Sequence, residues 1–173
     1  MEYTYNTYSF RNVYHNLDPA TRQEIIDLWT GEGVVSAEAA RKRVDEVVFT
    51  IRNPAGQLAG VTTVYVDNFV TRDNPYYFMR AFIRSRDRVR WGLLQFVSGK
   101  AIEFLKHHGD AALRPKGMIA LVENRKGWRV GARRYLERNG WSYLGIGPRG
   151  NHVWYINFDG SPMPQEIQQR FGG

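Results

Sequence analysis

Apolar residues recur at helical spacing near the start of the chain. Asp18 followed by Pro19 is typical of a helix N-cap and first turn, and the apolar face that follows ends near Gly31 and Gly33. This face contains Ile25, Ile26, Leu28 and Trp29. Ser36 is placed to cap a second helix, so the pattern predicts two consecutive helices.

β-Branched and aromatic residues dominate the next part of the chain and predict three strands. The first two are residues 47–52 and 57–66, and the Asn-Pro-Ala-Gly sequence at 53–56 between them predicts a hairpin turn. The third strand is residues 76–83. One further strand is expected near residues 8–13, within a region where aromatic residues recur mostly at even spacing.

The second half of the chain alternates between helical and strand patterns. Apolar residues at three- and four-residue steps predict a long helix over residues 88–108. A wholly apolar run at 117–122 predicts a strand that is buried on both faces, and a basic helix is expected at 126–139. Two final strands are predicted at 141–146 and 152–158.

This order of elements predicts an α/β fold with a mixed sheet and helices on both of its faces. We expect one domain over residues 1–159, because a chain of 173 residues is long enough to bury a single core. Residues 160–173 contain proline and glutamine and are expected to form a loose tail.

The composition excludes several kinds of chemistry. Hydrophobic residues make up 43% of the chain and aromatic residues 14%, which is not the composition of a disordered protein. No cysteine is present, so disulfides and thiolate nucleophiles are excluded, and four histidines without ligand spacing make a metal site unexpected. The pattern contains neither a signal peptide nor a membrane-spanning apolar run, so we expect a cytoplasmic protein.

Two segments carry a resemblance to the GNAT superfamily of N-acyltransferases. The first, YYFMRAFIRSRDRVRWGLLQFVSGKAIEFL, is similar to the family's central strand, pyrophosphate loop and following helix. The second, MIALVENRKGWRVGARRYLERNGW, is similar to the next strand and helix and their closing glycine and aromatic residue. The resemblance extends from Asp18 to Phe158 and implies a GNAT-like fold that transfers an acyl group from acyl-coenzyme A to an amine.

The pyrophosphate loop departs from the family pattern, Arg/Gln-x-x-Gly-x-Gly/Ala. The corresponding residues 88–93 read RVRWGL, so Gly92 alone remains of the small residues that let a phosphate approach a helix N-terminus. Three interpretations stay open: acyl-coenzyme A sits differently, arginine side chains hold its phosphates, or coenzyme A is not the donor. The cofactor-binding candidates are Arg84, Arg86, Arg88, Arg90, Gly92 and, by resemblance, Asn124.

The resemblance also implies a base for the acceptor amine and an acid for the leaving thiolate. Glu123 follows the apolar strand at the edge where parallel strands end, so it precedes Asp67 as candidate base, although both suit a surface or capping role. Tyr135 is the candidate acid. The tyrosine of the family would fall at Leu136, and one residue is a rotation of ~100° on a helix.

The net charge of +7 attracts polyanions, although solubility is the plainer explanation of it. On the basic helix, Arg129 and Arg133 share one face and Arg134 and Arg138 another, with Trp128 nearby. Basic residues with an aromatic residue suit nucleic acid, and a merely solvated helix face explains them as well. We therefore expect an N-acyltransferase whose acceptor amine is carried by DNA, RNA or another polyanion. The alternative is a GNAT-like module without catalysis that binds a nucleic acid or a protein partner.

If Arg84, Arg86, Arg129, Arg133 and Arg134 contact phosphates, affinity for DNA or RNA should fall with salt at a log–log slope of about −4. Replacing Arg133 and Arg134 with alanine should flatten this slope by about one to two, because fewer counterions are released. Fluorescence anisotropy across a salt series measures both slopes. A flat dependence in the wild type would mean that the charge only solubilises the protein.

Overall fold

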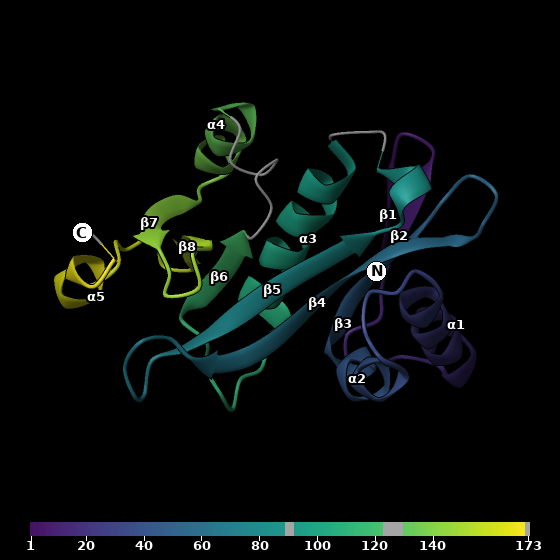
Figure 1. Ribbon diagram of the computed structural model, residues 1–173, viewed down its shortest axis with the longest axis horizontal. Helices are drawn as coiled ribbons and strands as arrows, with labels where there is room; N and C mark the ends of the chain where they lie inside the picture. The colour runs from purple at the N-terminus through teal and green to yellow at the C-terminus, as the bar shows by residue number, and fades with distance from the viewer. Residues whose placement is uncertain (89–91, 123–129, 172–173) are drawn as a thin grey trace. The chain divides into compact units, whose positions relative to one another are not determined.

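The structure, a computed structural model, describes residues 1–88, 92–122 and 130–171 (Figure 1). Eight strands in this part form one mixed sheet in the order β1-β2-β3-β4-β5-β6-β8-β7. The strands are β1 (Glu2–Tyr5), β2 (Tyr8–Asn12), β3 (Val47–Arg52), β4 (Leu58–Asn68), β5 (Pro75–Ile83), β6 (Gly117–Val122), β7 (Ser142–Ile146) and β8 (His152–Asn157). The α-helices are α1 (Pro19–Gly31), α2 (Ala37–Arg43), α3 (Gly92–His108), α4 (Val130–Arg138) and α5 (Gln165–Gln169), and two 3₁₀ turns are η1 (Val44–Glu46) and η2 (Ser85–Asp87). The predicted α/β class with a mixed sheet is confirmed.

The chain divides into two compact units. The first unit is Met1–Val64 with Arg80–Ala101, and the second is Tyr65–Met79 with Ile102–Gly173. Strands β4 and β5 and helix α3 each contribute residues to both units.

Strands β1 and β2 form an antiparallel hairpin in the first unit, where the sequence predicted a single strand. Tyr5 pairs with Tyr8 across a two-residue turn, and Asn6 adopts the left-handed conformation that such a tight turn requires, with φ of 55°. Asparagine tolerates this conformation better than most residues. The hairpin continues into β3 and β4 by antiparallel pairing.

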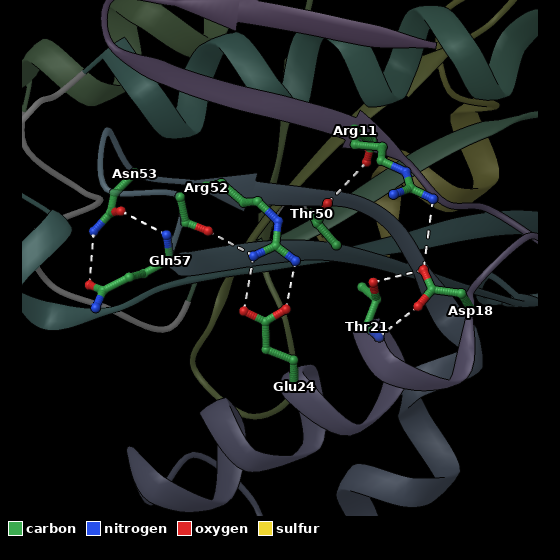
Figure 2. A network of polar contacts seen from close by, with 9 residues as sticks. Arg11, Asp18, Thr21, Glu24, Thr50, Arg52, Asn53 and Gln57 are labelled. Carbon is green, nitrogen blue, oxygen red and sulfur yellow. Dashed lines mark hydrogen bonds and ion pairs between the residues drawn. The ribbon is translucent and has the colours of Figure 1, made fainter.

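Helix α1 begins at the predicted cap. The Asp18 carboxylate accepts a hydrogen bond of 2.9 Å from the Thr21 backbone N–H, and this bond lowers the pKa of Asp18. The Arg52 guanidinium on β3 donates to both carboxylate oxygens of Glu24 on α1, at 3.0 Å and 2.6 Å, and to the Gly56 carbonyl at 2.9 Å (Figure 2). One arginine thus joins the helix, the strand and the hairpin turn.

The apolar face of α1 forms the core of the first unit, as its spacing predicted. Ile25 is fully buried, and it belongs to a cluster that also draws on α2, β3 and β4. The cluster contains Val13, Ile25, Ile26, Trp29, Ala40, Val44, Val47, Leu58 and Val61. Burial of this stripe stabilises the helix by more than its own propensity could.

In the second unit, β6 pairs in parallel with β5, and β8 pairs antiparallel with β6. The β5–β6 register runs through Tyr77–Met118, Phe78–Ile119 and Met79–Ala120. The paired strand β6 has the bounds that its apolar run predicted. The prediction that it is buried on both faces holds only for its first three residues, because Leu121 is 41% exposed.

The expectation of a loose tail is wrong for the part that contains α5. Met163 and Ile167 are each 1% exposed and pack with Phe69, Tyr76 and Ile119. The segment just before α5 is held by a hydrogen bond, since the Met163 N–H donates to the Tyr155 hydroxyl at 3.0 Å. Proline and glutamine suggested a loop, but two apolar side chains four residues apart are enough to dock one turn of helix.

The residues before the long helix differ in part from the prediction. Ser85–Asp87 form a 3₁₀ turn that Arg88 closes, so the predicted helical start at Arg88 is wrong, and the described helix α3 covers Gly92–His108. Within the described residues, none of the helices is both long and apolar enough to cross a membrane.

Replacing Ile167 with alanine should lower the free energy of unfolding by about 2–5 kcal/mol, because it removes a fully buried side chain from a packed cluster. Gln169→Ala on the exposed side of the same helix is the matched control and should stay within about 0.5 kcal/mol. Urea denaturation measures both. Equal, small effects would show that α5 does not pack on the rest of the second unit.

Candidate functional site

A buried carboxylate fixes the turn that follows β5 in the first unit. Asp87 is 5% exposed, and its two oxygens accept hydrogen bonds from the Arg84 Nε at 2.6 Å and the Tyr8 hydroxyl at 3.0 Å. The Arg84 N–H also donates to the Ala59 carbonyl at 2.8 Å. The structure therefore gives Arg84 a buried ion pair with Asp87, and its predicted contact with phosphate stays a prediction.

Two other arginines of the predicted phosphate-binding row keep their charge at the surface. The side chain of Arg86 is 65% exposed and lies 4.0 Å from Asp87. Arg88 is exposed, its Nε donates to the Ile83 carbonyl at 2.6 Å, and its guanidinium lies over the Phe82 ring. These contacts orient Arg88 without neutralising it. Arg90 lies outside the described residues.

A neighbouring side chain, rather than a phosphate, accounts for the glycine at position 92. A Cβ at this first residue of α3 would overlap the Tyr5 hydroxyl. The Tyr5 ring stacks on Phe96 of the same helix, with ring centroids 4.9 Å apart. The close approach that needs glycine at this position is thus made by the β1–β2 hairpin, which the loop pattern alone could not reveal.

A hollow of about 370 Å³ in the first unit lies beside this turn. It is lined by Asp27, Leu28, Gly31, Glu32, Arg84, Ser85 and Arg86. The lining residues come from the end of α1 with Glu32 just after it, and from the turn after β5. Because the lining combines acidic residues Asp27 and Glu32 with basic residues Arg84 and Arg86, it suits a ligand that carries both a cationic amine and an anionic group.

In the second unit, the carboxyl end of β6 lies beside the start of β8. Val122, the last residue of β6, pairs with His152, the first residue of β8. The parallel β5–β6 register ends before this point, at Met79 and Ala120. Carboxyl ends of parallel strands are where binding sites form in open α/β sheets. Glu123 and Asn124 follow directly in the chain, but they lie outside the described residues.

Tyr143 and His152 form a polar pair at this end of the second unit. The Tyr143 hydroxyl lies 3.0 Å from Nδ1 of His152. Burial raises the pKa of Tyr143, and the charge of Arg133, which lies over the Tyr143 ring at 5.8 Å, opposes this shift. Sequence reasoning assigned no role to Tyr143. The available signal was the hairpin around residues 147–150, which brings β7 back along β8.

The remaining predicted site residues lie on or before α4. Tyr135 is half-buried in this helix, and its role as the acid stays a prediction. Arg133 donates from Nε to Glu137 at 3.0 Å, so part of its charge is balanced, whereas Arg134 is exposed. Arg129 lies outside the described residues.

Comparison with known proteins shows the fold. No protein-family model matches this sequence, and no curated protein matches it. Solved structures do match. A ribosomal-protein-S5-alanine acetyltransferase from Vibrio fischeri has a TM-score of 0.63 at 11% identity, over 94% of this chain and 100% of that one.

Two further matches have similar scores. A GNAT-family acetyltransferase from Streptococcus pneumoniae has a TM-score of 0.55 at 14% identity, over 87% of this chain and 99% of that one. A spermidine N-acetyltransferase from Vibrio cholerae, in complex with CoA and spermine, has a TM-score of 0.56 at 13% identity, over 88% and 96%. The chain therefore has the fold of GNAT acetyltransferases, which confirms the predicted fold resemblance.

Replacing Asp87 with alanine should lower the free energy of unfolding by about 3–5 kcal/mol, because it leaves the buried Arg84 charge uncompensated. Asp45→Ala is the control, since Asp45 pairs with Arg22 at the exposed surface and should lose only about 0–1 kcal/mol. Chemical denaturation compares the two variants. Equal losses would contradict a structural role for the buried pair.

Proposed function

We propose that this protein is an N-acyltransferase that moves an acyl group from acyl-coenzyme A to an amine. The observation that carries the proposal is the GNAT fold over nearly the whole chain, shared with a spermidine N-acetyltransferase whose structure contains CoA. In this reaction the amine nitrogen attacks the thioester carbonyl, the N–C bond forms and the C–S bond breaks. The amine gives up one proton, and the coenzyme A thiolate takes one up.

The donor phosphates are held by Arg86 and Arg88. Both lie in the turn after β5 and are exposed, and guanidinium groups suit phosphate oxygens well. The loop lacks the small residues for close approach by backbone amides, and Tyr5 occupies the space beside Gly92. In this proposal, charged arginine side chains bind the phosphates that backbone amides of the loop bind in the family pattern.

The acceptor is a primary amine, and two features support different carriers for it. The carboxylates of Asp27 and Glu32 line the hollow in the first unit and favour a cationic amine there. The net charge of +7 and the exposed Arg134 favour an amine on DNA or RNA. A steep salt dependence of nucleic-acid binding supports an amine on DNA or RNA, and a flat one supports a small cationic amine. Nucleic-acid binding without acyl transfer would support the alternative of a non-catalytic binding module.

Isothermal titration with acetyl-coenzyme A tests the donor site. Arg86→Ala and Arg88→Ala should each weaken binding about tenfold, because each removes a charge-assisted contact to phosphate. Arg41→Ala removes an exposed arginine of α2 and is the control that should leave affinity unchanged. Equal affinity in all variants would contradict the arginine contacts.

Release of the coenzyme A thiol tests the activity itself. Wild-type protein is incubated with acetyl-coenzyme A and a panel of polyamines, amino acids, peptides and aminoacyl-RNA, and the thiol is measured by a disulfide reagent. Release above hydrolysis with one amine class supports the proposed function and names the carrier. Absence of both binding and release would overturn it in favour of a non-catalytic module.

A further inference from the structure

Two carboxylates in the lining of the first unit's hollow have no cation beside them. Asp27 and Glu32 are both exposed, and within the described residues neither forms an ion pair. Asp27 accepts a hydrogen bond of 2.8 Å from the neutral side-chain amide of Gln23, which leaves its charge in place. Both carboxylates lie near the carboxyl-terminal end of α1, where the helix dipole is negative and the last turn has no basic residue. A bound cation would therefore be stabilised by the two carboxylates and the dipole together.

The opposite charge in the lining comes from Arg84, whose guanidinium is only partly bonded. Its side chain is 8% exposed, and its Nε donates to Asp87. Among the described residues, the buried Nη2 of Arg84 has no hydrogen-bond partner. A buried N–H group without a partner costs free energy, and an anionic ligand in the hollow would supply the missing partner. Because Nη2 is covered in the free protein, this contact needs a small shift of the side chains around it.

The size and charge of the hollow restrict what can bind there. A volume of about 370 Å³ is that of a small-molecule site. The lining has two acidic and two basic residues, which suits a ligand whose own charges cancel. A polyamine would leave Arg84 without an anion, and a nucleic-acid strand would bring its phosphates against Asp27 and Glu32. The lining also includes Arg86, so a ligand in the hollow lies beside a proposed contact to the donor phosphates.

We propose that the acceptor is a small zwitterion, a primary amine that also carries a carboxylate, as a free amino acid does. This inference rests on the proposed function and names its acceptor class. Asp27 and Glu32 bind the ammonium group, and Arg84 binds the carboxylate. The ammonium loses one proton to solvent before its nitrogen attacks the thioester. As the N–C bond forms and the C–S bond breaks, the nitrogen loses a second proton and the thiolate takes one up, which gives an N-acyl amino acid and the free thiol.

Isothermal titration with a panel of L-amino acids, with and without coenzyme A, tests the ligand class. The carboxamide and the decarboxylated amine of the best ligand are the matched ligand controls. Each should bind about tenfold more weakly than the amino acid, because each lacks the charge that Arg84 binds.

The carboxylates are tested on the same amino acid. Asp27→Asn and Glu32→Gln should each weaken its binding about tenfold, because each removes a charge that holds the ammonium. Glu38→Gln removes an exposed carboxylate of α2 that pairs with Lys42, and this control should leave the affinity unchanged.

Arg84 needs a variant that leaves no buried charge alone. Arg84→Gln combined with Asp87→Asn removes both charges of the buried pair, and a thermal melt checks that the variant folds. In this variant the amino acid and its carboxamide should bind equally well, because the group that distinguishes them is gone. The comparison of the two ligands on the wild type tests the same contact without any substitution.

Four outcomes would overturn the inference. They are binding of no amino acid, equal wild-type affinity for the amino acid and its carboxamide, competition between coenzyme A and the amino acid, and thiol release with polyamines or RNA but with no amino acid. The last of these leaves the proposed function in place. Amino-acid binding without thiol release from any amine would overturn the proposed function and the ligand's part as acceptor, while the hollow would remain a zwitterion site.

Discussion

The buried carboxylate of Asp87 is the interaction on which the candidate donor site depends. A charge at 5% exposure is stable only when its oxygens are bonded, and here Arg84 and Tyr8 supply the two bonds. Tyr8 belongs to β2 and Arg84 to the end of β5, so one side chain ties the amino-terminal hairpin to the turn before α3. With that turn fixed, Arg86 and Arg88 are presented at the surface.

The same hairpin changes the physical character of the donor site. Tyr5 fills the space beside Gly92, so the start of α3 meets an aromatic side chain. Phosphate recognition by exposed arginines differs from recognition by backbone amides, because it depends on flexible side chains and weakens as salt screens them. The donor site proposed for this chain is thus a charged surface rather than a glycine-lined cradle.

A polar contact in the second unit joins two antiparallel strands. The Tyr143 hydroxyl on β7 lies 3.0 Å from Nδ1 of His152 on β8, and Trp154 and Arg133 pack against the tyrosine ring. Side chains on paired strands keep their orientation better than side chains on a loop.

The sequence by itself determined the elements whose signals are local. The Asp18 cap, the apolar stripe of α1 and the apolar run of β6 specified their structure within a few residues, because capping and periodicity act between near neighbours. Tertiary structure alone decided which arginine is structural and which is exposed, because Tyr8 and Asp87 are far apart in the chain. The contact of Tyr5 with Gly92, the pairing of Tyr143 with His152 and the docking of α5 also depend on strand register and on packing between distant segments, which no local pattern specifies.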